Sequence, residues 1–269
     1  MTDIISIILL GIVEGVTEFL PVSSTGHLIL ATKLLGYDAE KWAVFNIVIQ
    51  LGSILAIVVL YWRTFWAVGL GLLRRDPVSI RFVRNLLVAF VPAAVIGLAI
   101  HKQIEALLGN AEIVSTALIV GGFAIIAVER FAPKSDIVGV ADIPLGKVVG
   151  IGFLQCLAMV PGVSRSGATI LGALALGVER RTAAEFSFFL AIPTMLGATT
   201  LELVKNREAL MSGSGVGFGA IALGFAVAFV VAVIVVKAFV GVVTRYGFVP
   251  FAWYRIAAGT AALIWLATL

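Results

Sequence analysis

The sequence has few charged residues, only two histidines and a single cysteine. Charged residues make up 13% of its 269 positions, hydrophobic residues make up 61%, and the mean hydropathy is +1.13. Soluble domains carry about 25% charged residues, so this composition excludes an ordinary soluble fold and indicates a polytopic integral membrane protein. The lone Cys156 excludes an intramolecular disulfide and a cysteine-rich metal site, and its neighbours suggest a packing role.

The positive charge of the chain is modest and dispersed. The net charge is +4 and the pI is about 9.4, with the arginines spread over loops between apolar runs. This distribution favours contact with an anionic lipid leaflet, and we expect no nucleic-acid partner. The first residues lack the positive charge and the small-residue cleavage site of a signal peptide, so we expect the N-terminus to belong to the mature fold.

The apolar runs are of two lengths, judged against the roughly 20 residues that a spanning helix needs. Six are long enough to cross a bilayer: Trp42–Trp62, Asn85–His101, Ile113–Val128, Phe186–Leu201, Val216–Val236 and Phe248–Leu269. Four are about half that length and form two pairs: Ile4–Phe19 with Ser24–Leu35, and Gly146–Val160 with Ser164–Leu176. A proline-serine turn joins each pair, which is typical of a re-entrant helical hairpin.

The two pairs are related by a shift of about 141 residues. This shift aligns Ser23 with Ser164 and Gly26 with Gly167, and it aligns Glu14 with Gln155. We therefore predict an all-α membrane protein in one domain, residues 1–269, with repeats at about 1–130 and 144–269. Each repeat is a hairpin plus three spans. Three crossings per repeat place the second repeat upside down relative to the first, as in many transporters.

Positive charge sets the expected orientation. The segment 62–84, interpreted as a loop, contains five arginines, and we place it in the cytoplasm. The link 130–147 then also lies inside, and both termini lie outside. On this topology the first hairpin enters from the outer face and the second from the inner face, so that their turns meet near the midplane and the site opens toward the outer face.

The first hairpin contains the stretch from Glu14 to His27, which concentrates polar groups in an apolar chain. Glu14 and Glu18 are one helical turn apart, so they share a helix face. Two carboxylates in a low dielectric are stable together only when one is protonated or a cation lies between them. The pair therefore indicates a metal or phosphate site, a proton relay, or acids at an interfacial helix end. Oxygen ligands favour Mg²⁺ or Ca²⁺.

The hydroxyls that follow Pro21 suit an anion. Ser23, Ser24 and Thr25 are natural N-caps, and the N-terminus of a helix attracts phosphate. His27 lies in the first turn of that helix, where it could act as a general base or acid, or as a buried hydrogen-bonded residue.

The second turn also has serines after a proline, and in addition it contains an arginine. In the stretch from Pro161 to Thr169, the guanidinium of Arg165 is suited to phosphate oxygens, or it could extend from a shallow turn toward the membrane surface. Further donors are available from Ser164, Ser166 and Thr169. Acids, hydroxyls, an imidazole and an arginine between apolar helices suit a phosphorylated amphiphile whose tail stays in lipid. Arg255 interrupts the last span, and either snorkelling or pairing with Glu185 or Glu202 would explain it.

On its two motifs, Glu14-Gly-Val-Thr-Glu18-Phe-Leu-Pro-Val-Ser-Ser-Thr-Gly-His27 and Pro161-Gly-Val-Ser-Arg-Ser-Gly-Ala-Thr169, the chain resembles the undecaprenyl-diphosphate phosphatases of the bacitracin-resistance type. The resemblance covers essentially the whole chain. It implies a bacterial inner-membrane enzyme that uses a divalent cation to hydrolyse the diphosphate of the polyprenyl carrier, which recycles the carrier for peptidoglycan synthesis. It also assigns importance to a set of site residues: Glu14, Glu18, Ser24, His27, Ser164, Arg165 and Thr169.

Two chemical routes fit this interpretation. Ser24, deprotonated by His27, could attack the terminal phosphorus, or His27 could activate water directly. In either route Glu14 and Glu18 would hold the cation, and Arg165 would neutralise phosphate charge. The alternative is a transporter or flippase of polyprenyl phosphate lipids, because inverted repeats with central carboxylates are transporter features. A homodimer is compatible with the sequence.

Overall fold

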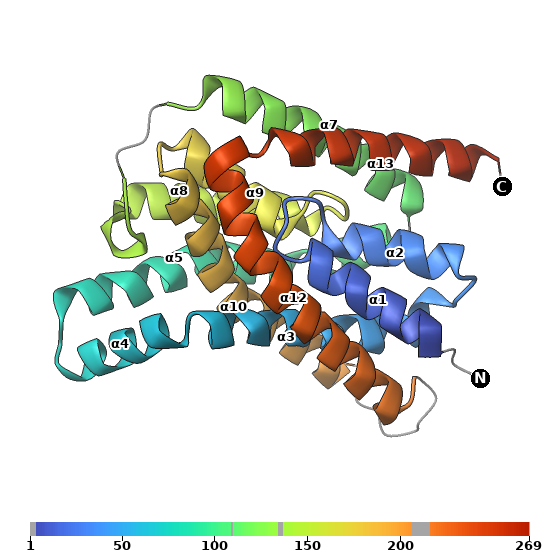
Figure 1. Ribbon diagram of the computed structural model, residues 1–269, viewed down its shortest axis with the longest axis horizontal. Coiled ribbons are helices and arrows are strands. Elements are labelled where there is room, and N and C mark those ends of the chain that lie inside the picture. The colour runs from blue at the N-terminus through green and yellow to red at the C-terminus, as the bar shows by residue number, and fades with distance from the viewer. Residues whose placement is uncertain (1–3, 109, 134–136, 206–215, 269) are drawn as a thin grey trace.

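The computed structural model describes residues 4–108, 110–133, 137–205 and 216–268, and these form an all-helical protein with no regular strand among them (Figure 1). The first half contains α1 (Ile4–Thr17), α2 (Ser24–Leu34), α3 (Ala39–Leu60), α4 (Trp62–Leu73), α5 (Pro77–Ala99), α6 (His101–Leu108) and α7 (Ala111–Phe131). The second half contains the 3₁₀ turns η1 (Val140–Asp142) and η2 (Cys156–Met159), and the helices α8 (Leu145–Gln155), α9 (Arg165–Ala175), α10 (Arg180–Lys205), α12 (Phe218–Tyr246) and α13 (Val249–Ala267).

The lengths of these helices confirm a polytopic membrane fold. Five described helices are long and apolar enough to cross a bilayer, namely α5, α7, α10, α12 and α13. A sixth crossing is provided by α3 with α4 if that pair, which is bent by 71°, counts as one broken span. The four half-length runs are also short helices, within one or two residues of the predicted ends, except that α8 finishes in the 3₁₀ turn η2.

The prediction of a loop over residues 62–84 was wrong. Most of that segment is helical, because α4 continues after the bend at Tyr61 and α5 begins at Pro77 instead of Asn85. Asp76 caps α5 by accepting hydrogen bonds from the backbone N–H and the hydroxyl of Ser79. These bonds lower the pKa of the Asp76 carboxyl. An acidic N-cap followed by proline at the first helical position is a signal for the start of a helix. In this sequence Pro77 lies eight residues before the predicted start at Asn85.

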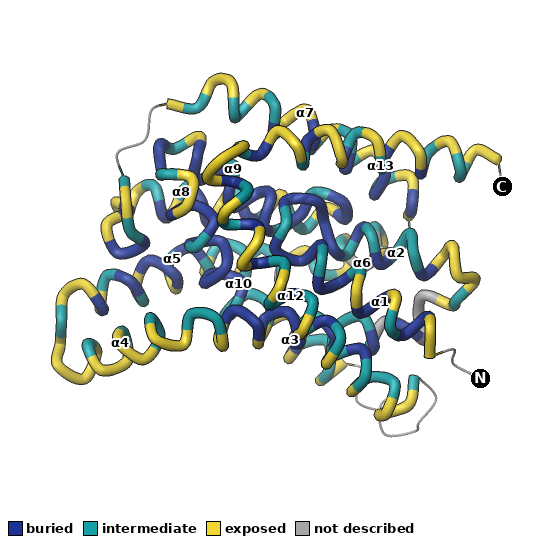
Figure 2. Tube along the Cα trace, viewed as in Figure 1, coloured by how far each residue is buried: buried dark blue, intermediate teal, exposed yellow. Residues whose placement is uncertain are grey.

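The protein exposes large apolar side chains on its surface, and its mainly apolar interior also contains many buried polar groups. Figure 2 shows exposed residues along α4, α12 and α13 and buried residues concentrated in the middle of the bundle. Large apolar side chains are exposed on the outer helices, including Trp66, Leu98 and Ile234, whereas Glu14, Ser187 and many other polar groups are buried. Apolar side chains on the surface lose nothing when the solvent is lipid, so this distribution is that of a membrane-embedded protein.

Helices of the two halves pack against each other at close range. Helix α1 lies on α12, where a Cβ at Gly15 would come within 2.7 Å of the carbonyl oxygen of Ala228. Helix α8 lies on α5, where a Cβ at Gly152 would come within 2.7 Å of the carbonyl oxygen of Ala89. Only glycine permits such an approach. Each hairpin is therefore held by a helix from the opposite half of the chain.

Candidate functional site

The two hairpins end in turns with the same local geometry. Ser23 and Ser164 cap α2 and α9, and both have positive φ angles, 72° and 80°. Each hydroxyl accepts a hydrogen bond from the backbone N–H three residues later, Gly26 at 3.3 Å and Gly167 at 3.0 Å. Left-handed backbone in a non-glycine residue costs roughly 1–3 kcal/mol and is concentrated at functional sites. The predicted capping role of these two serines is confirmed.

The first turn, residues 18–23, contacts the start of α9, which directly follows the second turn, residues 160–164. The hydroxyl of Ser166 donates to the carbonyl oxygen of Leu20 at 2.7 Å. Arg165 Nη2 donates to Glu18 Oε1 at 2.9 Å, which forms an ion pair whose two side chains are 11% and 4% exposed. Two residues that are 147 positions apart in the chain thus form one charged pair at the centre of the molecule.

Glu18 makes a second contact on its other oxygen. The hydroxyl of Ser24, itself buried, donates a hydrogen bond to Glu18 Oε2. The carboxylate therefore lies between a hydroxyl and a guanidinium. An ionised carboxylate in this position can orient the hydroxyl and accept its proton.

Arg165 is held from its far side by α10. Nη1 donates to the carbonyl oxygen of Ser187 at 2.7 Å, and the hydroxyl of Thr169 donates to Ser187 Oγ at 2.7 Å. The Nε–H group of Arg165 is buried and has no hydrogen-bond partner in the described part of the chain. A buried N–H group of a guanidinium that has no hydrogen-bond partner lowers the stability of the protein unless it donates to an anion.

A cavity of about 450 Å³ lies against this pair. Its polar end is formed by the two turns and the helix starts that follow them: Glu18, Ser23, Ser24, Thr25, Ser164 and Arg165. Its longer, apolar part runs between α5, η2 and α10, with walls that include Phe90, Leu98, Met159, Met195 and Leu201. We call the whole space the turn cavity. The N-termini of α2 and α9 both face its polar end, which favours an anion there.

Gln155 also lines the turn cavity and was missed as a candidate. Its side chain is buried, its Oε1 accepts a bond from Thr194 at 3.4 Å, and its Nε2 has no partner among the described residues. The alignment of Gln155 with Glu14 in the predicted repeats was the available signal, because it marked a polar residue on an otherwise apolar half-helix.

Glu14 lies behind the turn cavity and does not line it. It is fully buried, and neither carboxylate oxygen has a hydrogen-bond partner in the described chain, although Ser53 of α3 lies beside it. The residues described contain no group of three or more His, Cys, Asp or Glu side chains that could hold a metal. Any cation here would have to use the orphaned oxygens of Glu14 with Glu18, together with hydroxyl oxygen.

Two of the residues that were expected to donate to phosphate, Ser166 and Thr169, bond other parts of the protein instead of lining the turn cavity. Ser166 is buried and bonds Leu20 and the hydroxyl of Ser164 at 3.0 Å. The hydroxyl of Thr169 is fully buried and bonds the backbone of its own helix as well as Ser187. Neither residue lines the turn cavity. The structure places both where they hold the turns and Arg165 in position.

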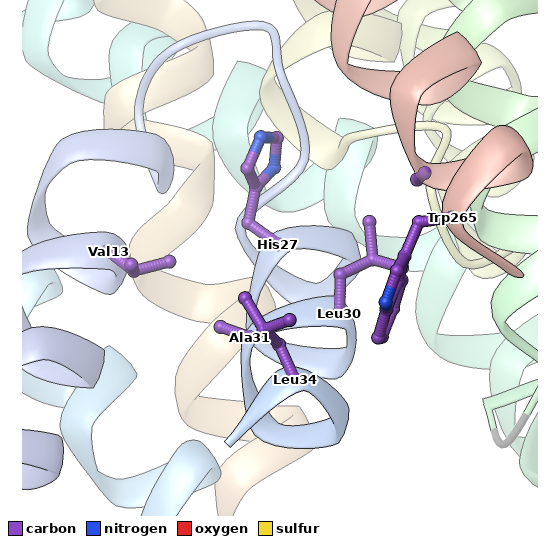
Figure 3. Close-up of a pocket in the computed structure, with 7 residues that line it drawn as sticks. Val13, His27, Leu30, Ala31, Leu34 and Trp265 are labelled. Atoms are coloured by element: carbon purple, nitrogen blue, oxygen red, sulfur yellow. The ribbon is translucent and has the colours of Figure 1, made fainter. Parts of the chain in front are cut away.

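His27 contacts the backbone of Ser23 and the side chain of Tyr254. Its Nδ1 is 2.7 Å from the carbonyl oxygen of Ser23, so Nδ1 carries the proton, and its Nε2 is 2.8 Å from the hydroxyl of Tyr254. Figure 3 shows His27 in a separate small cavity with Val13 of α1 and Trp265 of α13. No hydrogen bond joins His27 to Ser24 among the described residues, so the expected deprotonation of Ser24 by His27 has no direct contact to support it. The His27 ring instead bonds Tyr254 of α13.

Arg255 contradicts both sequence interpretations, because it neither snorkels nor pairs with Glu185 or Glu202. It is 1% exposed, and its guanidinium donates to five main-chain carbonyl oxygens. Glu185 instead pairs with Arg181 at 3.0 Å, and Glu202 pairs with His101 at 3.3 Å.

Comparison with known proteins identifies the family of the chain. A model of the family described as "Bacitracin resistance protein BacA" matches residues 7–261, a range that includes both turns and Arg255. The chain belongs to this family. Similar members of the bacitracin-resistance family are proteins named undecaprenyl-diphosphatase from Novosphingobium aromaticivorans, 66% identical over 99% of both chains, and from Rhizorhabdus wittichii, 60% identical over 98% of both. A third, from Sphingopyxis alaskensis, is 57% identical over 99% of both.

Proposed function

We infer that the protein is an integral membrane phosphatase that hydrolyses undecaprenyl diphosphate to undecaprenyl phosphate and phosphate. The observation that carries this conclusion is the Glu18–Arg165 pair, which joins the two turns at the polar end of a largely apolar cavity. A diphosphate fits the polar end and the first part of a polyprenyl chain fits the apolar walls. The named relatives support the same activity. The expected partners are thus the lipid substrate and the bilayer.

Arg165 and the two helix N-termini would bind the terminal phosphate. We expect the unpaired Nε–H of Arg165 and the Nε2 amide of Gln155, both buried in this structure, to donate to phosphate oxygens when the substrate is bound. Fixed donors of this kind act in a water-poor site, where they stabilise developing negative charge most strongly. Positioning and charge stabilisation are the main requirements of phosphoryl transfer.

Ser24 is placed to be the nucleophile and Glu18 to be its base. Ser24 Oγ would attack the terminal phosphorus while its proton passes to Glu18, and the bond to the bridging oxygen would break to release undecaprenyl phosphate, which takes up the proton from Glu18. Water would then attack the phosphoserine while a proton of that water passes to Glu18, and Glu18 would return this proton to Ser24 Oγ as phosphate leaves. This assignment replaces His27 with Glu18, because Ser24 donates to Glu18 and His27 faces Tyr254. Water activated directly by Glu18 is the competing route, and a trapped phosphoserine at Ser24 would exclude it.

The residues present fit a divalent cation. Glu14 has two orphaned buried oxygens beside Ser53, and hard oxygen donors suit Mg²⁺ or Ca²⁺. We propose that Glu14 and Glu18 hold such an ion, which when bound would supply positive charge toward the diphosphate.

The activity and its metal dependence can be measured together. Purified protein is expected to release phosphate from a polyprenyl diphosphate, to stop when EDTA is added and to resume with Mg²⁺ or Ca²⁺. Glu14→Gln is expected to raise the metal concentration needed for half-maximal rate at least tenfold, since one ligand loses its charge. Full release in EDTA would remove the metal proposal. Release of no phosphate under any condition would favour the transporter alternative, tested by movement of the lipid phosphate in liposomes.

We propose further that both termini lie outside, that the turn cavity opens toward the outer face, and that the hairpins enter from opposite faces as parts of inverted repeats. The support is the cluster of arginines on and between α4 and α5, which favours the cytoplasm: Arg63, Arg74, Arg75, Arg81 and Arg84. Lys134, in the other expected inner segment, lies outside the described residues. A cysteine introduced by Arg74→Cys, with Cys156→Ser as background, should react with an impermeant maleimide only from the cytoplasmic side. Labelling from outside would invert the topology. Whether the protein forms a homodimer is decided by the mass of the purified detergent complex.

A further inference from the structure

Arg255 connects three separate parts of the chain through main-chain atoms. Its Nη1 donates to Pro21 O at 2.8 Å and to Val163 O at 2.9 Å, which belong to the two different turns. Its Nη2 donates to Gly162 O at 2.9 Å and to Ala117 O of α7 at 3.0 Å. Its Nε donates to Leu118 O at 3.2 Å. All five N–H groups of the guanidinium are therefore used.

The position of Arg255 is built for this arrangement. Helix α13 packs along α7, and the guanidinium occupies the space that a side chain at position 121 would take. A Cβ at Gly121 would come within 2.0 Å of Arg255 Nη2. Buried carbonyls in turns lack regular helical partners, so a single cation that satisfies carbonyls of both turns fixes their separation.

Arg255 does not line the turn cavity, and its effect must pass through the turns. Pro21 O lies three residues after Glu18 in the first turn, and Val163 O lies two residues before Arg165 in the second. A shift of one turn against the other would change the 2.9 Å contact between Glu18 and Arg165. Catalytic geometry is sensitive to displacements of about 1 Å, which can cost roughly 100-fold in rate.

We propose that Arg255 is a positioning residue of the phosphatase: by holding the carbonyls of Pro21, Gly162 and Val163 together, it sets the distance between the two turns and thereby aligns Glu18 with Arg165. The proposal rests on the hydrolysis proposed above. It assigns Arg255 no contact with the lipid. A lysine cannot replace it, because an ammonium has three donors and lacks the planar fork.

A double-mutant cycle separates positioning from general stabilisation. Arg255→Lys is expected to lower kcat/KM roughly 10- to 100-fold and to raise KM in protein that elutes as a single folded species, and Arg165→Lys is expected to lower kcat/KM about 100-fold. Because Arg255 acts through the Glu18–Arg165 pair, the double variant should be only slightly worse than Arg165→Lys alone. If the loss of kcat/KM in the double variant equals the product of the two single losses, the proposal is overturned. It is also overturned if Arg255→Lys leaves KM unchanged and only reduces the fraction of folded protein.

Gly121→Ala provides a second variant that leaves Arg255 in the chain. Its methyl group must displace the guanidinium, so it should reproduce the kinetic change of Arg255→Lys. Gly241→Ala in α12 is the matched control, because a Cβ there meets nothing within 4 Å, and its kinetics should equal those of the wild type. Wild-type-like kinetics in Gly121→Ala would contradict the proposal. Inactive wild-type protein would instead contradict the hydrolytic function itself, so the two failures are distinguishable.

Discussion

Replacing Arg165 with lysine is expected to lower kcat/KM about 100-fold and to leave the protein folded. Lysine keeps the positive charge beside the buried carboxylate of Glu18, so the charge balance of the core is preserved. It loses the Nε donor and the fork that reaches both Glu18 and Ser187. Loss of one fixed donor to a developing oxyanion typically costs roughly 100- to 1000-fold in kcat. Steady-state phosphate release over a range of lipid concentrations measures the effect.

Arg165→Ala should lower both the activity and the stability of the protein more than Arg165→Lys does. It removes the donor and also leaves Glu18 as a buried charge without a cation, so the thermal unfolding midpoint should fall along with activity. Arg181→Lys is the matched control, because this arginine pairs with Glu185 at 3.0 Å but its side chain is 64% exposed and lies away from the turns. It should retain activity within about twofold, as expected for an exposed pair. An Arg165→Lys enzyme with wild-type kcat/KM would show that Arg165 has no part in the transition state.

Glu18→Gln is expected to lower kcat roughly 1000-fold, which lies within the usual range for loss of a general base. The amide has nearly the same shape and can still accept a bond from Arg165, but it cannot take the proton of Ser24. Binding of the lipid should be affected less than turnover. Single-turnover phosphate release, with binding of the lipid measured separately, distinguishes the two effects.

Glu129→Gln is the control for removing a partly buried, paired carboxylate. Glu129 accepts bonds from Arg180 at 2.7 Å and from the backbone N–H of Phe248 at 2.8 Å, and it does not line the turn cavity. Its replacement should lower stability without changing kcat. Retention of more than about a tenth of the wild-type kcat by Glu18→Gln would exclude Glu18 as the base, and attention would then return to His27.

The half-helix pairs and their capping serines were predictable because their signals are local. Hydropathy summed over a short window distinguishes half-length from full-length helices, and a serine after a proline break marks a helix start within one residue. Ser23 and Ser164 therefore lie where they were expected. The composition likewise predicted a membrane protein, since 61% hydrophobic residues exceed what an aqueous surface allows. The boundary of α5 was missed because the uninterrupted apolar run begins only after Arg84, whereas the helix begins after its cap at Asp76.

Partnerships between distant side chains could not be derived from these local signals. The sequence by itself determined that acids, hydroxyls and an arginine would lie on two polar turns in an apolar bundle. Only the tertiary structure decided that Glu18 bonds both Ser24 and Arg165, that His27 bonds Tyr254, and that Gln155 lines the turn cavity. Arg255 shows the physical reason most clearly. Its partners are main-chain carbonyl oxygens, which every residue has, so they cannot be predicted from residue types. Only the packing of α13 against α7 and the two turns defines them.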